Sequence, residues 1–325
     1  LSLPEKTKKY VMLNGPDIYV SKDKNKWDLV YHANWDLKQI IYVKELDKYF
    51  VTTQDYDKLY TGSNLENLEL KSNLTGVPYP KEIKYIPQLK KIFIVGDIGY
   101  VIGYENGRIM FSTDGENWDG GFTIGGRNPI NIYSVAYSDK NNRLVFTGGN
   151  NNTYYSDDGG SVLYSYQTMT PYQKILYIKN MKKIFSCKAS TEDGSYWLYL
   201  NNLELQDFEY SEDSSIFVGF KNNDCYISFN CQEWLKLNLG LDSLTSITKI
   251  KYIKKDKTFY IIGNISNNYC LIELKLEDNT NIINKLNSDS DMTLNLSIGI
   301  NNMKISCSEG SIGGVIKYRQ KYLGV

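Results

Sequence analysis

Apolar and polar positions alternate along this chain in a repeated pattern that predicts paired β-strands. A tyrosine with an apolar residue two positions before it is followed, seven to nine positions later, by an apolar triplet. The five clear copies start at Tyr42, Tyr85, Tyr137, Tyr177 and Tyr252. Polar, turn-prone residues fill the interval between the two apolar pieces. Because alternation with a period of two marks a half-buried strand, each copy predicts two short strands joined by a tight turn.

The spacing of these copies indicates a repeat architecture. Degenerate copies at Tyr210 and Leu296 extend the series, and the mean spacing from Tyr42 to Leu296 is about 42 residues. A period of roughly 40 to 45 residues, with about four short strands in each repeat, is typical of β-propeller blades. The chain is therefore expected to be all-β and to form a single β-propeller domain over residues 1–325. Seven blades is the preferred number, with six and eight as alternatives.

A second motif follows an aromatic or β-branched strand and predicts a tight turn, called here the Ser-x-Asp turn. It reads Ser, any residue, Asp or Asn, three further residues and a large apolar residue. The four copies contain Ser21, Asp23 and Trp27; Ser112, Asp114, Gly115 and Trp118; Ser156, Asp158 and Gly159; and Ser228, Asn230 and Trp234. The Asp or Asn oxygen can accept backbone N–H bonds across the turn, and glycine supplies a positive φ. Residues 61–68 and 200–208 are expected to be decayed copies.

The four Ser-x-Asp turns resemble the Asp-box, or BNR, repeat of sialidase-like β-propellers. The resemblance rests on a seven-residue motif seen four times and on the blade-like spacing over residues 10–320. It implies that the turns join the two outer strands of a blade, on the side away from the ligand face, and that their role is structural. On this basis the chain is identified as a non-catalytic member of that family.

The two ends of the chain carry complementary halves of a repeat. Residues 10–31 contain a Ser-x-Asp turn without a tyrosine unit, whereas residues 293–319 contain a weak tyrosine unit without such a turn. We expect the two halves to combine in one blade, because strands from both termini would close the propeller and remove its exposed sheet edges.

Strand alternation also predicts which side of the propeller can bind a ligand. In a blade of four antiparallel strands, a to d, the Ser-x-Asp turns join c to d, so the b–c and d–a connections share the opposite side, called here the loop face. Residues 96–107 and 188–195 are among the expected b–c loops, and residues 32–37 and 71–81 are among the d–a connections. Loops on a rigid scaffold commonly carry function, and aromatic rings beside polar groups suit sugars or peptides. The candidate ligand-binding residues are Trp35, Asp55, Tyr56, Tyr79, Asp97, Tyr100, Arg127, Tyr172 and Glu192. Packing between blades is the alternative role for the tyrosines.

Composition and charge narrow the range of partners. Basic and acidic residues both number 37, so the chain lacks the positive excess that nucleic-acid-binding proteins carry. The single histidine, His32, and five cysteines without CxxC spacing predict no metal site and no cofactor. The longest apolar stretch, residues 92–104, is interrupted by Asp97 and by glycines, and it is too short for membrane insertion.

The residues that a sialidase-like enzyme requires are not recognisable. Catalysis in that family needs an arginine cluster that clamps a carboxylate, a tyrosine nucleophile with a glutamate partner, and an acid/base aspartate. The chain has four arginines, of which Arg143 is expected in an a–b turn away from the loop face, and it has no Phe-Arg-Ile-Pro segment. Lysine does not replace the bidentate guanidinium group. Sialidase activity is therefore not expected, while other glycosidases, which need only two suitably spaced carboxylates, stay an alternative.

These observations favour a non-catalytic binding propeller that recognises a cell-surface glycan or protein through its loop face. Lysine outnumbers arginine by 33 to 4, which is typical of an AT-rich genome such as that of a clostridial bacterium or its phage. The chain resembles receptor-binding components of phage tails and tail-like bacteriocins, which implies an extracellular or virion location within a larger assembly or multidomain chain. The alternatives are a glycan-processing enzyme or carbohydrate-binding accessory domain, and a protein assembly scaffold, for which a cytoplasmic location is open.

Overall fold

A computed structural model gives the fold of most of the chain. It describes residues 1–276 except residues 3, 5, 55–56, 73–78, 102–103, 120–122, 125–130, 150, 161–162, 168–173, 239–243 and 266–267, and beyond these only short strands between residues 294 and 322. The helical elements in this described part are two 3-10 helices, η1 (Lys44–Leu46) and η2 (Lys254–Asp256). The expected all-β class is confirmed.

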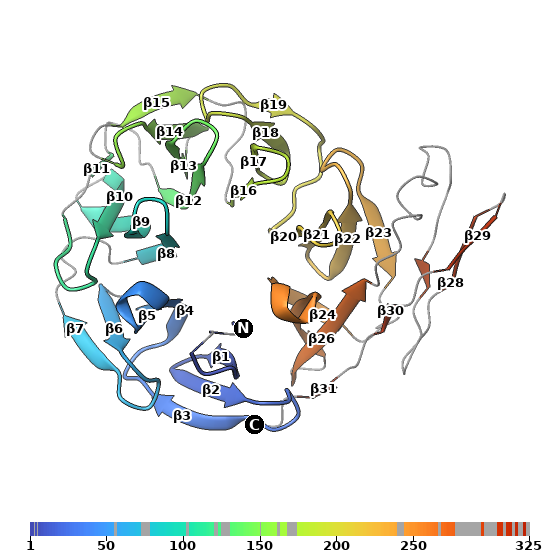
Figure 1. The fold of residues 1–325 in the computed structure, drawn as a ribbon, viewed down its shortest axis with the longest axis horizontal. Coiled ribbons are helices and arrows are strands. Elements are labelled where there is room, and N and C mark those ends of the chain that lie inside the picture. Colours follow the sequence, from blue (N-terminus) through green and yellow to red (C-terminus); the bar gives the residue numbers. More distant parts are fainter. Residues whose placement is uncertain are drawn as a thin grey trace. The chain divides into compact units, whose positions relative to one another are not determined.

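Seven sheets follow one another along the described chain, and each is built on three or four consecutive antiparallel strands (Figure 1). The first three contain β1 (Tyr10–Asn14), β2 (Asp17–Ser21) and β3 (Asp28–His32); β4 (Leu37–Val43), β5 (Lys48–Thr53), β6 (Lys58–Gly62) and β7 (Glu69–Ser72); and β8 (Tyr79–Ile86), β9 (Lys91–Val101), β10 (Tyr104–Ser112) and β11 (Thr123–Ile124). The fourth and fifth contain β12 (Ile132–Ser138), β13 (Arg143–Gly148), β14 (Asn152–Ser156) and β15 (Tyr164–Gln167); and β16 (Leu176–Ile178), β17 (Lys183–Phe185), β18 (Ala189–Thr191) and β19 (Leu198–Tyr199). The sixth begins with β20 (Asp207–Ser211), β21 (Ile216–Lys221), β22 (Asp224–Ser228) and β23 (Leu235–Asn238), and the seventh with β24 (Leu244–Ile253), β25 (Thr258–Ile265) and β26 (Asn268–Leu276). The preferred number of seven blades is confirmed.

Contacts within the chain define two compact units. The first contains Leu1–Ser186 and Ser190–Leu198, and the second contains Cys187–Ala189 and Tyr199–Val325. Within the first unit, β4, β8 and β12 each form the inner edge of a sheet, and these sheets lie side by side (Figure 1). That the whole chain is one domain stays a prediction.

The tyrosine repeat forms strands a and b of the second to seventh sheets, as predicted. The first tyrosine lies opposite the residue seven positions later, and where both are aromatic the rings contact each other: the centroids of Tyr42 and Tyr49 are 4.9 Å apart, and those of Tyr252 and Phe259 are 4.8 Å apart. The residue five positions after the tyrosine has a left-handed backbone in all six turns, with φ from 50° to 54°. These residues are Asp47, Lys90, Asn142, Lys182, Ser215 and Lys257. One left-handed residue at a fixed position gives each turn the same reversal of the chain.

A β-bulge in strand a aims one side chain at the next sheet. The register shifts directly before Gln39 in β4 and before Glu82 in β8. Gln39 Oε1 accepts the N–H of Ile83 at 3.1 Å, and its Nε2 donates to the Ile83 carbonyl at 3.0 Å. Glu82 Oε2 accepts the N–H of Val135 and the hydroxyl of Ser134, both at 2.8 Å. Bulges commonly redirect a side chain in this way, and here the redirected groups join neighbouring sheets.

The residue that follows the bulge in strand a also links later pairs of sheets. Ser134 also follows a bulge, and its Oγ accepts the N–H of Ile175 at 3.3 Å. In the second unit, Lys249 takes this position and its Nζ lies 3.0 Å from Asp207 Oδ2. The inner strands are therefore linked by polar side chains at one repeated register position.

The predicted Ser-x-Asp turns join strands c and d. Between β10 and β11, Ser112 Oγ accepts the N–H of Gly115 at 2.8 Å, and Asp114 Oδ1 accepts two further backbone N–H groups at 2.8 Å. These bonds stabilise the carboxylate, so the pKa of Asp114 lies far below its ordinary value, and equivalent bonds lower the pKa of Asp23 to about 2. A Cβ added to Gly115 would lie 2.4 Å from the ring of Phe50. The turn therefore packs directly against the preceding sheet.

A fifth Ser-x-Asp turn, in addition to the predicted four, lies between β18 and β19. Thr191 replaces serine, and its Oγ1 accepts the N–H of Gly194 at 2.8 Å, while Asp193 Oδ1 accepts the N–H of Ser195 at 2.9 Å. The expected b–c loop over residues 188–195 is therefore wrong, because β18 and a c–d turn fill most of it. The expected decayed copy at residues 200–208 is also wrong, because this segment connects β19 to β20.

The decayed copy predicted at residues 61–68 is confirmed as the turn between β6 and β7. Asn64 Oδ1 accepts the N–H of Asn67 at 2.8 Å, as the aspartate does in the other turns. Gly62 takes the place of serine, and a Cβ there would lie 2.6 Å from the Asn67 carbonyl oxygen. The turn closes too tightly for a side chain at this position.

The chain ends pair in the following way where the structure describes them. Ser2 and Val11 exchange two backbone hydrogen bonds of 2.8 Å, so Ser2 lies along the free edge of β1. Of the C-terminal strands, β27 (Leu294–Asn295) pairs with β23, β28 (Lys304–Cys307) pairs with β29 (Gly310–Gly313), and β30 (Ile316–Lys317) and β31 (Lys321–Tyr322) pair with β26. Most of residues 293–319 lie outside the described residues, so the shared closing blade stays a prediction.

The second strand of five sheets places a buried phenylalanine in the core. Phe50, Phe93, Phe146, Phe217 and Phe259 are buried to within 1% of complete burial. They lie in near-continuous apolar runs, because a strand in the middle of a sheet that is covered on both sides has no solvent-facing positions.

Candidate functional site on the loop face

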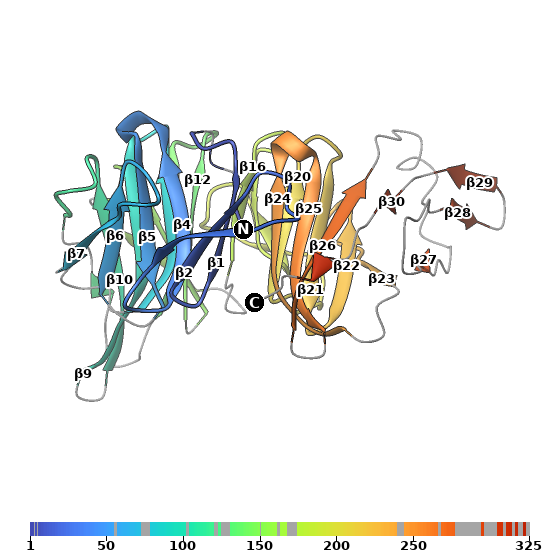
Figure 2. The same cartoon turned by 90° about the horizontal axis from the view of Figure 1, so that it is seen from below.

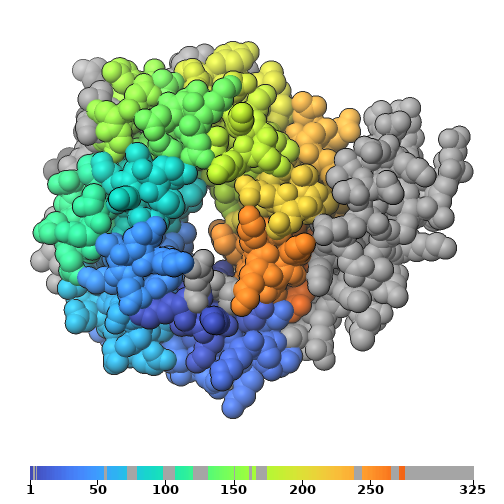
Figure 3. All heavy atoms as spheres, viewed as in Figure 1, coloured from blue at the N-terminus to red at the C-terminus, as the bar shows by residue number. Residues whose placement is uncertain are grey.

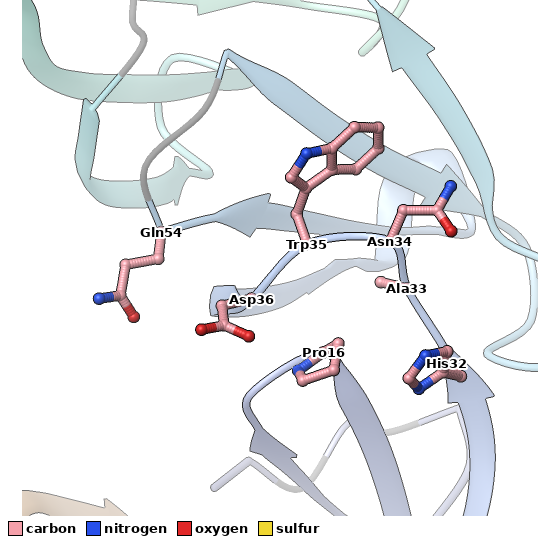
Figure 4. Close-up of a pocket in the computed structure, with 7 residues that line it drawn as sticks. All are labelled: Pro16, His32, Ala33, Asn34, Trp35, Asp36 and Gln54. Carbon is pink, nitrogen blue, oxygen red and sulfur yellow. The ribbon is translucent and has the colours of Figure 1, made fainter.

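A depression of about 530 Å³ lies on the loop face of the first unit (Figure 4). Its lining residues are Pro16, His32, Ala33, Asn34, Trp35, Asp36 and Gln54. Pro16 belongs to the b–c turn of the first sheet, residues 32–36 to the d–a connection that follows it, and Gln54 to the b–c connection of the second sheet. In this part of the molecule, b–c and d–a connections meet on one side, as predicted.

Backbone hydrogen bonds hold the connections around the depression. The N–H of Ala33 donates to the Pro16 carbonyl at 2.9 Å, and the N–H of Gln54 donates to the Asp36 carbonyl at 2.8 Å. These bonds join three segments that are separate in the sequence. The depression is therefore built by fixed backbone, and its shape does not depend on side chains alone.

The middle of the d–a connection is supported from below by tyrosines. The hydroxyl of Tyr60 accepts the N–H of Asn34 at 3.2 Å, and its ring packs edge-on against Tyr31 with centroids 5.7 Å apart. Burial raises the pKa of Tyr31, which donates its hydroxyl to the Leu68 carbonyl at 3.1 Å. Both rings thus form a rigid apolar support beneath the depression.

A histidine that is hydrogen-bonded to an aspartate forms one wall. His32 Nδ1 lies 2.6 Å from Asp17 Oδ1, and the His32 side chain is 67% exposed. The Asp17 carboxylate accepts the Nδ1–H, which fixes the ring and leaves Nε2 as the nitrogen available to a ligand.

Trp35 and three exposed polar side chains form the rest of the rim. Lys58 Nζ lies 5.8 Å from the centre of the Trp35 ring, a distance at which a cation is attracted to the aromatic face. Asn34, Asp36 and Gln54 are exposed, and their side chains have no hydrogen-bond partner in the described part of the protein. Figure 4 shows Asn34 and Asp36 on the d–a connection and Gln54 on the neighbouring segment, with the three side chains pointing in different directions. They offer amide and carboxylate groups to a ligand without having to break an existing bond.

The lining defines what this site can do. It combines an aromatic ring, a proline, two amides, a carboxylate and an oriented imidazole, and its seven residues include no hydroxyl, thiol or amine side chain. Such a set suits reversible binding through hydrogen bonds and stacking. Within the described residues, no group of three His, Cys, Asp or Glu side chains is placed to hold a metal ion. No helix in the described part is long and apolar enough to cross a membrane.

Of the nine predicted ligand-binding residues, the structure brings Trp35 into the depression. Asp55, Tyr56, Arg127 and Tyr172 lie outside the described residues. Tyr100 lies near the end of β9, and its side chain is also outside the described part. Their roles stay predictions.

Tyr79 and Asp97 lie together at the loop-face end of the third sheet. They are strand partners in β8 and β9, and Tyr79 is 40% exposed. Asp97 is buried, and Lys81 Nζ lies 3.1 Å from its Oδ2. The expected loop over residues 96–107 is wrong, because β9 and β10 continue through most of it and extend beyond the neighbouring strands (Figure 2). Tyr79 stays a candidate, whereas burial and the ion pair give Asp97 a structural role.

Glu192 does not belong to the loop face. It lies on the fifth Ser-x-Asp turn, where it forms an ion pair with Lys140 and its carbonyl accepts the Asn141 side chain at 2.6 Å. Lys140 also lowers the pKa of Glu192. The error arose because the strand before this turn is only three residues long, so Thr191 was not recognised as the start of the motif.

Sequence reasoning did not select four other lining residues, His32, Asn34, Asp36 and Gln54. His32, Asn34 and Asp36 lie in a connection that was assigned to the correct face, and Gln54 directly follows β5. Their position in predicted b–c and d–a connections was the available signal. Their meeting in one depression depends on the packing of two sheets.

Comparison with known proteins shows the fold. No protein-family model and no curated protein sequence matches the chain. Among solved structures, YCF48 from Cyanidioschyzon merolae has a TM-score of 0.58 at 13% identity, over 81% of this chain and 91% of that chain. YCF48 bound to a D1 peptide has a TM-score of 0.58 at 12% identity, over 84% and 89%. A functionally unknown protein from Desulfotomaculum acetoxidans has a TM-score of 0.55 at 14% identity, over 79% and 88%.

These likenesses agree with the seven consecutive sheets. The chain is a β-propeller with seven blades, similar in fold to propellers of the YCF48 type. At this level of identity, the fold alone is shared, and function must be argued from the site. Figure 3 shows the surface in the view of Figure 1.

Proposed function

We propose that this protein is a non-catalytic binding propeller that holds an extended segment of a partner protein in the Trp35 depression. The observation that carries the proposal is the depression itself. It joins an aromatic ring to exposed Asn34, Asp36 and Gln54, whose polar groups have no partner among the described residues. A peptide backbone offers both donors and acceptors, which two amides and a carboxylate can meet.

A peptide partner has further support from the comparisons. One structurally similar protein, YCF48, was solved bound to a D1 peptide. The likeness is one of fold, so it supports the type of ligand and carries no residue over to this chain. A depression of this size can hold a short segment but not a folded domain. Because its connections are held by backbone hydrogen bonds, the propeller loses little conformational entropy on binding.

A cell-surface glycan is the second candidate. Trp35 beside Asp36 gives the combination of an aromatic face and a carboxylate that sugar rings use for stacking and hydrogen bonding. With either ligand, we propose an extracellular or virion setting, such as the receptor-binding part of a phage tail or tail-like particle, as the composition indicates. Asp-box family membership is part of the same proposal, and it is supported by the hydrogen bonds of the Ser-x-Asp turns.

The two ligand classes can be separated in one set of measurements. The purified chain is screened against a displayed library of linear 12-residue peptides and, in parallel, against a glycan array, and hits are titrated by calorimetry. We expect peptide hits that lose at least tenfold in affinity with Trp35→Ala and several-fold with Asp36→Ala. Glu192→Ala is the matched control, because it removes an exposed carboxylate from a Ser-x-Asp turn, and it is expected to leave affinity unchanged.

The outcomes are distinct. If glycans bind and their binding depends on Trp35, the ligand is a glycan and the peptide proposal is wrong. Ligands whose affinity is unchanged by Trp35→Ala and Asp36→Ala would show that the depression is not the binding site. Release of a reducing sugar or a cleaved peptide during incubation would refute the non-catalytic assignment.

A further inference from the structure

Two cysteines of the second unit lie side by side in different turns. Cys187 lies in the turn between β17 and β18, and Cys231 lies in the Ser-x-Asp turn between β22 and β23. The side chain of Asn201 connects their backbones, because its Nδ2 donates to the Cys187 carbonyl at 3.2 Å and to the Cys231 carbonyl at 2.6 Å. A single amide nitrogen thus lies between the two residues.

Cys231 takes a position at which the other turns favour glycine. Its φ is +60°, and Gly194 at the same position of the fifth turn has a φ of +81°. A Cβ added to Gly194 would lie 2.6 Å from Val145 Cγ2, in strand b of the preceding sheet. The side chain at this position therefore points toward the preceding repeat.

Cys187 occupies the matching position of the preceding repeat. It is the tenth residue after Tyr177, as Thr147 is the tenth after Tyr137. Thr147 pairs with Thr153, whose hydroxyl donates to the Gly194 carbonyl at 3.3 Å. In the fourth and fifth sheets, the residue at the glycine position is thus bonded to the strand partner of the tenth position, and in the next repeat both positions are cysteine.

The electrostatics agree with this placement. Cys231 is completely buried, and Cys187 is partly exposed. Burial raises the pKa of both thiols, and the charge of Cys187 raises the pKa of Cys231 further. Because the thiolate is the reactive form, we expect oxidation of these thiols to be faster at alkaline pH than at neutral pH.

We propose that Cys187 and Cys231 are a disulfide site that cross-links the two turns when the protein meets a small-molecule disulfide such as oxidised glutathione. The more accessible Cys187 thiolate attacks one glutathione sulfur, forms a mixed disulfide and releases one glutathione thiolate. The Cys231 thiolate then attacks the Cys187 sulfur and releases the second glutathione. The two cysteines lose two protons and two electrons, and one oxidised glutathione becomes two reduced molecules.

The test uses the full chain and oxidised glutathione at pH 8.5. Free thiols are then alkylated, and the protein is digested without reduction for peptide mass spectrometry. The expected product is one cross-linked peptide pair that contains Cys187 and Cys231 and disappears after reduction. Closing this loop is expected to raise the melting temperature by roughly 5 °C, reversibly with dithiothreitol.

Two variants separate the proposal from a general effect of oxidation. Cys231→Gly restores the residue that suits a positive φ, so it is expected to fold, to leave Cys187 uncross-linked and to lose the temperature shift. Cys225→Ala removes a buried thiol in β22 and is expected to retain both the cross-link and the shift. The proposal is overturned if both thiols of the wild type remain alkylatable after prolonged oxidation at pH 9, or if Cys187 pairs instead with Cys270 or Cys307.

Discussion

Glu82 allows the connection between neighbouring sheets to be measured. Its Oε2 accepts the N–H of Val135 and the hydroxyl of Ser134, both at 2.8 Å, and Val135 is fully buried. With Glu82→Ala, the Val135 N–H loses its partner in a place that water does not reach. A hydrogen bond to a charged group contributes about 1.5–3 kcal/mol, and an orphaned buried donor costs about 1–3 kcal/mol.

The two contributions overlap, because they describe the same lost acceptor. We therefore expect Glu82→Ala to lower the free energy of unfolding by about 1.5–3 kcal/mol. The repeat itself supplies the control. Gln39 holds the same register position one sheet earlier, and its Oε1 accepts the equivalent N–H at 3.1 Å. Glu82→Gln keeps such an acceptor and is expected to cost less than about 1 kcal/mol.

Urea unfolding followed by far-ultraviolet circular dichroism and by tryptophan fluorescence measures both variants. Because the chain has two compact units, the transition assigned to Leu1–Ser186 is fitted separately if two transitions are seen. The slope of the fit should stay constant while the midpoint moves. A Glu82→Ala protein within about 0.5 kcal/mol of the wild type, or a Glu82→Gln protein that is equally destabilised, would refute this account of the bulge position.

Three further outcomes are expected. Gly115→Ala should lower the free energy of unfolding by about 3 kcal/mol, because its Cβ would lie 2.4 Å from the Phe50 ring and its φ is +75°. A melting temperature equal to that of the wild type would contradict the packing of the turn. The Asp23 and Asp114 carboxylates have lowered pKa values, that of Asp23 being about 2, so their contribution is present above the ordinary carboxyl pKa and is lost as the pH falls from about 4 to 2. The double Asp23→Asn, Asp114→Asn variant keeps the accepting oxygens and should show a flatter dependence of melting temperature on pH in that range; an unchanged profile would assign the acid sensitivity to other groups. Trp35→Ala should leave the melting temperature within about 2 °C of the wild type while it removes ligand binding, and a large loss of stability would instead show that the ring is part of the core.

Much of the local structure was predictable because it repeats within the sequence. Each tyrosine unit gave strands a and b, and Asp47 and Lys257 show why: one left-handed residue at a fixed distance from the tyrosine closes every turn in the same way. The Ser-x-Asp turns were equally readable, since their hydrogen bonds join residues two to four positions apart. The copy at Thr191 was missed because the motif was defined with serine at its first position, although the threonine hydroxyl can accept the same hydrogen bond.

The candidate site was predictable only in part. Trp35 was selected because it is an aromatic residue in a d–a connection, which alternation of strands assigns to the loop face. Glu192 was misplaced because one unrecognised short strand moves every later connection of that sheet to the opposite side. The side of a connection is thus determined by counting strands, and a single missed strand reverses it.

By itself, the amino-acid sequence determined the class of the protein, the positions of most turns and the six strand pairs of the tyrosine repeat, because these depend on residues within about ten positions of one another. The tertiary structure alone decided which groups meet. Pro16 and Gln54 line one depression, Glu82 reaches Val135, and Cys187 lies beside Cys231, although tens of residues separate the members of each pair. The reason is that such contacts depend on how one sheet packs on the next, and that packing is set by bulges, buried side chains and closing turns acting together.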